Sequence, residues 1–150
     1  MGNGRVRTAA LALPYAVEFA ARDAATLAVV HIHEIFVGYG GAYPVVVDEG
    51  ELREQIAQQV EDLRDDGLDA TFTVRSCQGG HAARAIAEIA TEIGADLILV
   101  GTHGYGRVSS ALVGSVTMSL LHGGVCPVLA VPAGNTVAAP KLQLVGGAVG

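Results

Sequence analysis

Residues 96–132 read DLILVGTHGYGRVSSALVGSVTMSLLHGGVCPVLAVP, and this stretch decides the fold. It begins with an apolar run, DLILV, that favours a buried strand, and it continues into a loop rich in glycine. A helical segment follows at about 109–122, and the run CPVLAV at 126–131 predicts another buried strand. The order strand, glycine loop, helix, strand is typical of a parallel α/β sheet.

The chain before this stretch continues the alternation of helices and strands. The expected helices lie at 8–23, 49–66 and 81–93, and the expected strands at 26–33 and 69–76. In parallel α/β sheets, ligands lie outside the carboxyl ends of the strands. We therefore expect a site in the loops that follow His33, Ser76, Val100 and Val131.

Composition narrows the class of protein. The chain has 150 residues, of which 51% are hydrophobic and 16% are charged, so one domain with an aliphatic core is expected. The net charge of −6 argues against nucleic acid as the main partner, because phosphate backbones are bound by clustered Lys and Arg. No apolar run reaches the roughly 18 residues of a membrane span. Cys77 and Cys126 form no CxxC pair, which favours reduced thiols in a cytoplasmic protein.

Four residues of the decisive stretch have a spacing that suits a phosphate cradle. Gly101 and Gly104 lie in the loop, and Gly114 and Ser115 follow after nine intervening residues. These four residues are called the glycine pattern below. Glycines let the backbone approach a phosphate, and the N-terminus of the next helix adds partial positive charge. The hydroxyl of Ser115 is expected to contact a phosphate oxygen.

Several of these signals have a plain structural alternative. The glycines also suit a tight turn with close helix packing. In the same loop, His103 and Arg107 either reach the phosphate or are exposed. His31 and His33 have the i, i+2 spacing of a metal pair, but no third ligand is evident, so histidines satisfied within the strand are expected. The loop 35–48 overhangs the expected cleft, either as a lid or as a variable segment.

Residues 96–132 closely resemble the C-terminal half of the universal stress protein family. Nucleotide-binding members of that family carry G-x2-G-x9-G-[S/T], and the glycine pattern matches it completely. The upstream helix, the strand TLAVVHIHE and the segment GGHAARAI also fit the family's order. The resemblance covers residues 8–132, which we expect to form one domain. The tail 133–150 is expected to be disordered or to add a short strand.

The resemblance implies a fold, a ligand and an assembly. The fold would be a Rossmann-like sandwich with a parallel sheet, related to the adenine-nucleotide α-hydrolase group. The ligand would be ATP or AMP, with or without magnesium, and the assembly a homodimer through the last strand at 126–131. Ile32 would contact adenine through its backbone, and Val100 would line the same cleft. The residues implied to hold ribose and phosphates are Gly101, Gly104, Gly114, Ser115 and Val116.

The N-terminus departs from the family. Its members begin with a strand of the type I-L-V-x-x-D-G-S, whose aspartate binds the adenosine part of the ligand, whereas here only MGNGRVR precedes the first helix. The family's sheet order, 3-2-1-4-5, makes this absent strand the central one. Its removal leaves its neighbours on the order of 10 Å apart. The neighbours would then close up, another segment such as Lys141–Val145 would fill the place, or the sequence would be an N-terminally shortened version that folds poorly.

Three functions from different classes remain. The intact glycine pattern favours a nucleotide-dependent stress-response or signalling module. The absent strand and aspartate favour a dimeric interaction protein that has lost nucleotide binding. An enzyme, at most a weak ATPase, has little support, because no general base or metal carboxylate lies near the glycine pattern.

Overall fold

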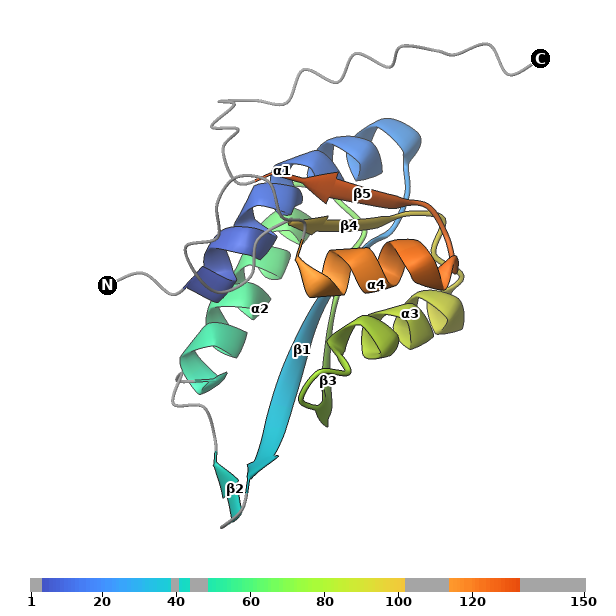
Figure 1. Ribbon diagram of the computed structural model, residues 1–150. Coiled ribbons are helices and arrows are strands. Elements are labelled where there is room, and N and C mark those ends of the chain that lie inside the picture. The colour runs from blue at the N-terminus through green and yellow to red at the C-terminus, as the bar shows by residue number, and fades with distance from the viewer. Residues whose placement is uncertain (1–3, 39–40, 44–48, 102–113, 133–150) are drawn as a thin grey trace, which may run out of the picture.

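A computed structural model describes residues 4–38, 41–43, 49–101 and 114–132 (Figure 1). Side-chain surroundings are described for 12–38, 49–101 and 114–132. Helices and strands alternate along these parts of the chain. In order they are α1 (Gly4–Asp23), β1 (Leu27–Gly38), β2 (Gly41–Tyr43), α2 (Glu49–Asp65), β3 (Ala70–Gln78), α3 (Ala82–Ile93), β4 (Ile98–Gly101), α4 (Ser115–Gly123) and β5 (Val128–Val131).

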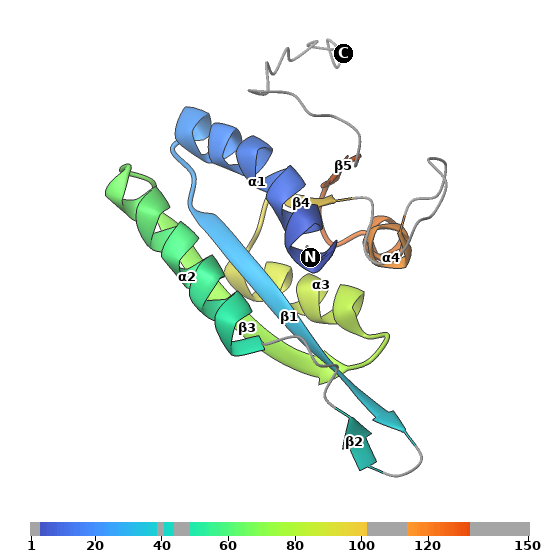
Figure 2. The ribbon, with the colours of Figure 1, turned by 90° about the vertical axis from the view of Figure 1, so that its left-hand side faces the viewer.

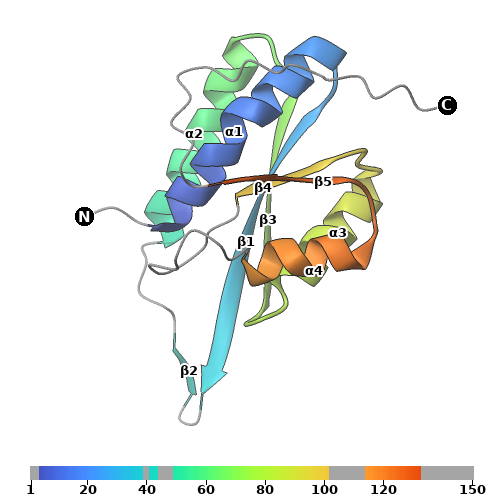
Figure 3. The same ribbon diagram turned by 45° about the horizontal axis from the view of Figure 1, so that its top comes forward.

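The strands form two sheets. β1 pairs in parallel with β3, and β2 adds an antiparallel pairing at the far end of β1. β4 pairs in parallel with β5. Among the described residues no ladder joins β1 to β4, and Figure 3 shows β4 and β5 running across β1 and β3. The expected α/β architecture with parallel strands is confirmed. The described parts of β1 and β4 are not joined in one ladder, and Lys141–Val145 lies outside the described residues.

Helices cover both sides of the strands. α1 and α2 lie on one side, and α3 and α4 lie on the other (Figure 3). α1 packs against β4 and β1, whereas α2 packs against β3. On the opposite side α3 contacts β1, β3 and α4. None of the described helices combines the length and apolar character that a membrane crossing needs.

Small residues let the helices approach the strands closely. α1 buries Ala12, Ala16 and Ala20, which are spaced four residues apart and therefore share one helix face. On the other side, Ala90 of α3, Ile98 of β4 and Leu120 of α4 form a core cluster. The sequence lacks Trp, and alanine and aliphatic side chains supply the buried contacts.

Several expected boundaries are wrong. β1 continues past His33 to Gly38 and turns into β2, so much of the expected loop 35–48 is strand. α1 begins at Gly4, ahead of the expected start at residue 8. Among the described residues the fourth helix begins at Ser115 with Gly114 as its N-cap, and the expected start near 109 lies outside the described residues. The remaining elements agree with expectation to within a few residues.

Candidate functional site

The two ends of the glycine pattern are close in space because α4 packs back onto the end of β4. Gly101 is the last residue of β4, and Gly114 is the N-cap of α4. Thr117, in the first turn of α4, is only 2% exposed, and its hydroxyl donates a hydrogen bond to the carbonyl of Gly101 over 3.3 Å. This bond ties the carboxyl end of the strand to the N-terminus of the helix.

The N-terminus of α4 has donors to offer. Gly114 has extended backbone angles, and no side chain caps the helix at this residue. Its carbonyl accepts the amide of Met118 over 3.0 Å, which starts the helical ladder. Ser115 is exposed, and Val116 is half-buried against the core cluster of Ala90, Ile98 and Leu120. The first N–H groups of a helix have no partner within it, and with the helix dipole they favour an anion.

Ile32 lies on β1 and directs its backbone away from β3. The amide of Leu27 donates to Asp69 over 2.7 Å, and the carbonyl of Ile35 accepts from Gly79 over 2.9 Å. Odd-numbered residues of β1 therefore pair with β3, and the alternation of a parallel ladder turns the N–H and C=O of Ile32 to the opposite edge. That edge has no strand partner here among the described residues. Among the described residues the N–H and C=O of Ile32 therefore make no ladder hydrogen bonds.

The remaining predicted residues fall into two groups. Val100 pairs with Ala130 of β5, and its half-buried side chain packs against the core cluster. His103, Gly104 and Arg107 lie outside the described residues. The structure therefore brings Gly101 close to Gly114, Ser115 and Val116 at the start of α4. Ile32 lies on the other sheet.

Both histidines of β1 are held by α2. Nε2 of His31 lies 2.9 Å from Oε2 of Glu49, and Nδ1 of His33 lies 3.5 Å from Nη2 of Arg53. The side chains of His31 and Glu49 are mostly buried, at 12% and 18% exposure. Within the described part of the chain no group of three or more His, Cys, Asp or Glu is placed to hold a metal ion. The expectation of partnered strand histidines is confirmed.

Thr117 is the residue that the sequence analysis missed. In the sequence, a threonine inside an apolar helical segment cannot be told from an ordinary surface or core residue. The spacing of the glycine pattern does not indicate that the hydroxyl of Thr117 bonds to the carbonyl of Gly101. Its position after Gly114-Ser115, in the first turn of the helix, is the one signal available, because hydroxyls there often bond to nearby backbone.

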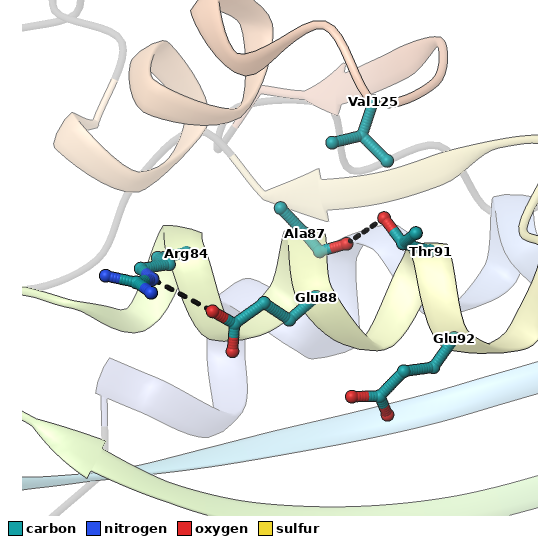
Figure 4. Close-up of a pocket in the computed structure, with 6 residues that line it drawn as sticks. All are labelled: Arg84, Ala87, Glu88, Thr91, Glu92 and Val125. Carbon is teal, nitrogen blue, oxygen red and sulfur yellow. Dashed lines mark hydrogen bonds and ion pairs between the residues drawn. The ribbon is translucent and has the colours of Figure 1, made fainter.

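A shallow depression in the described surface lies apart from the glycine pattern. It is lined by Arg84, Ala87, Glu88, Thr91, Glu92 and Val125, mainly from the outer face of α3 (Figure 4). Its polar groups largely satisfy one another. Arg84 pairs with Glu88 at 2.8 Å, and the hydroxyl of Thr91 donates to the carbonyl of Ala87. The depression offers few free donors that converge on one point, so we do not assign it a ligand.

The groups whose pKa is shifted also lie away from the glycine pattern. The hydrogen bonds from Arg75 to Glu92, over 3.0 and 2.7 Å, lower the pKa of the Glu92 carboxyl below its ordinary value. Burial raises the pKa of the Cys77 thiol, and the nearby Glu34 adds to the effect. Cys77 and Cys126 are both free, and both are half-buried.

Comparison with solved structures gives the same fold. A universal stress protein from Archaeoglobus fulgidus superposes with a TM-score of 0.61 at 22% identity, over 82% of this chain and 88% of that one. A structure of the protein from the same organism in complex with dAMP gives a TM-score of 0.58 at 23% identity, over 82% and 86%. A universal stress protein in complex with cAMP gives 0.56 at 21% identity, over 87% and 91%. At these identities the likeness concerns the fold.

Comparison of sequences identifies the family. Universal stress protein A homolog 2 of Coxiella burnetii is 35% identical over 119 residues, which cover 77% of this chain and 80% of that protein. Homolog 1 of the same organism is 32% identical over 124 residues, covering 77% and 82%. The model of the universal stress protein family matches residues 5–132. With the fold and the glycine pattern, these matches show that the chain belongs to the universal stress protein family.

Proposed function

We propose that this protein binds an adenine nucleotide, ATP or AMP with or without magnesium, and that cytoplasmic partners read the bound state during the stress response. The observation that carries the proposal is the bond from Thr117 to Gly101, which ties the end of β4 to the N-terminus of α4. Further support comes from the two neighbouring structures described as complexes with dAMP and cAMP.

Each part of the site has a role in this proposal. Phosphates bind to backbone amides of the glycine pattern and Val116, to the hydroxyl of Ser115, and to His103 and Arg107. Adenine binds to the open backbone groups of Ile32. The net charge of −6 makes backbone amides and the helix dipole the main source of attraction for the phosphates.

The second candidate is a dimeric interaction protein that does not bind nucleotide. One observation favours it: Ile32 and Gly101 lie on two separate sheets, so the proposed adenine and phosphate contacts share no continuous ladder. In both candidates we propose a homodimer through β5. Among the described residues, β5 is paired only on the edge that faces β4.

Thermal unfolding under ATP titration, with magnesium or with a chelator, distinguishes the two candidates. A binder gains about 2.7 kcal/mol of stability when the ligand reaches 100 times its Kd. Gly114→Val should abolish the gain, because the side chain occupies the phosphate approach. The backbone angles of Gly114 are ones that valine adopts readily, so the fold should survive.

Gly123→Val is the matched control, since a Cβ at Gly123 of the same helix meets no heavy atom within 4 Å. This variant should keep the nucleotide-dependent shift. If the wild-type protein shows no shift at millimolar ATP, the interaction-protein candidate replaces the nucleotide-binding one. Phosphate release that disappears in Gly114→Val would add ATPase activity to the first candidate.

A further inference from the structure

We propose that the paired ends of β1 and β2 bind the same ends of a second copy of this chain, so that the two copies form one four-stranded antiparallel ribbon. The paired ends are residues 36–38 of β1 together with β2 (Gly41–Tyr43), and they are called the arm below. Figure 2 shows the arm extending past α2 and α3. The proposal does not depend on nucleotide binding, and it uses a different strand from the proposed dimer through β5.

The arm exposes apolar side chains of β1 on both faces. Phe36 is 47% exposed and Val37 is 74% exposed, which makes Val37 the most exposed large apolar side chain in the described part of the chain. Successive residues of a strand point to opposite faces, so β1 is uncovered on both faces here. Two strands alone are at best marginally stable in water, and a wider sheet stabilises them. The arm therefore gains from a further strand.

One backbone edge of the arm is available for pairing. Odd-numbered residues of β1 direct their N–H and C=O toward β3, and even-numbered residues direct theirs toward β2. β3 ends at Gln78, and beyond it the amide of Gly79 donates to the carbonyl of Ile35. Val37 is the next odd-numbered residue, and within the described ranges no strand lies beside it on that edge. Its N–H and C=O can therefore bond to an added strand.

The length of this open edge matches a second arm. The edge runs only from Phe36 to Gly38, because Gly79 already bonds to Ile35. A longer strand would continue beside Ile35 and meet Gly79, whereas a second arm has an open edge of the same short length. In an antiparallel pair with a two-fold axis at Val37, each Val37 exchanges both hydrogen bonds with its counterpart. The contact is then self-complementary, as a symmetric dimer requires.

The side chains of two arms also suit each other. On one face the two Val37 side chains lie directly opposite and form an apolar cross-strand pair. On the other face Phe36 lies opposite Gly38 of the second copy, which leaves room for the ring.

The distribution of charge favours a second copy over an anionic partner. Residues 35–47 carry no charged side chain, whereas the whole chain has a net charge of −6. This net charge opposes binding of the arm to nucleic acid or to an anionic membrane. Antiparallel pairing through the arms joins two acidic chains at an uncharged stretch and places their bodies at opposite ends of the ribbon.

Charge-swap variants at Val37 test the proposal by sedimentation velocity over a range of protein concentrations. The wild-type chain should associate as its concentration rises. Val37→Lys and Val37→Glu each place two like charges opposite each other, so either variant alone should raise the Kd of this association at least about tenfold. An equal mixture of the two variants places opposite charges there and should restore the association. Both variants should unfold in urea at the wild-type midpoint, because Val37 is so exposed.

Val74→Lys and Val74→Glu are the matched controls, because Val74 is an exposed valine of β3 in the same sheet and lies outside the arm. These variants should associate as the wild type does, alone and mixed. Val37→Pro tests the backbone contact: it removes an N–H on an open edge, where proline is tolerated, and should fold but lose the association.

Three outcomes overturn the proposal. In the first, the wild type and the Val37 variants sediment alike at every concentration, which assigns any association to β5 or to another surface. In the second, each Val37 variant loses the association and the mixture does not restore it, which excludes a two-fold contact at Val37. In the third, the chain does not self-associate but cosediments with vesicles of zwitterionic phospholipid, and Val37→Lys abolishes this binding, which assigns the arm to a membrane surface.

Discussion

Thr117 illustrates what a single residue adds to the glycine pattern. The spacing of Gly101, Gly114 and Ser115 is visible in the sequence, because it depends only on the residue types and their separation along the chain. The contact that brings these residues together is not visible, since it depends on how α4 packs back onto β4. A buried hydroxyl bonded to a carbonyl in another element is a tertiary feature, which local patterns do not encode.

Thr117→Val should weaken both the fold and the proposed site. Valine keeps the volume of threonine but leaves the carbonyl of Gly101 without its donor, which costs about 1–3 kcal/mol of unfolding free energy. Urea denaturation measures the loss, and ATP titration should show a smaller thermal shift. Thr91→Val is the matched control, because Thr91 is exposed and bonds only within its own helix. An equal loss of stability in both variants would contradict a special role for Thr117.

The pair of Arg75 and Glu92 predicts a pH dependence of stability. The pKa of Glu92 is lower in the folded chain than its ordinary value of 4.5, so the pair contributes above that value. The contribution disappears as the pH falls through the folded-state pKa, because the protonated carboxyl loses its charge. Stability should therefore decline in acid below 4.5, by a small amount since the Glu92 side chain is 57% exposed and that of Arg75 is 32% exposed.

The variants Glu92→Gln and Arg75→Gln should each flatten this acid decline, since either one removes the interaction. Chemical denaturation at a series of pH values measures the slope. The double variant should have no further effect beyond either single change. A slope that persists in both single variants would assign the decline to other carboxylates.

At the scale of elements, helical periodicity predicts much of the core and fails at the ends. α3 has Ile86, Ile89, Ala90 and Ile93 at helical spacing, and the middle two are buried. Ile93, the last residue, is 55% exposed, because Gly94 adopts a left-handed conformation and ends the helix there. The antiparallel pairing of β1 with β2 likewise escapes the periodicity, since glycine-rich sequence at 38–41 favours a loop.

The end of β1 is packed against the turn before α3, and this contact can be tested. Gly79 donates its amide to Ile35, and a Cβ at Gly79 would lie 2.2 Å from the ring of Phe36. Gly79→Ala should therefore lower stability by about 1–3 kcal/mol through overpacking. Phe36→Ala in the same chain should remove most of that loss, as a double-mutant cycle in thermal or urea unfolding would show.

Gly123→Ala is the control for this cycle, since its added Cβ meets nothing within 4 Å and alanine favours the helix. This variant should be neutral or slightly stabilising. If Phe36→Ala does not rescue Gly79→Ala, the ring of Phe36 is not the group that the new methyl displaces.

At the scale of the whole molecule, local patterns predict the helices and strands but not how the strands divide. The sequence indicates alternating α and β elements, and the structure has them. Whether β1 and β4 share a sheet depends on long-range packing, and among the described residues no ladder joins these two strands. The consequence is a molecule in which α1 and α3 bridge two separate ladders.

This division predicts that the two ladders unfold with different midpoints. Leu52 of α2 is 4% exposed on the side of β3, and Leu120 of α4 is 4% exposed in the cluster with Ile98 of β4. Truncation of either leucine to alanine should cost about 2–5 kcal/mol, with the local ladder affected most. Urea titration followed by NMR at amides of β1 and β3, and separately of β4 and β5, measures each midpoint. Leu52→Ala should lower the first set more, and Leu120→Ala the second. If each variant lowers all midpoints equally, the bridging helices couple the two sheets into one cooperative unit despite the missing ladder between them.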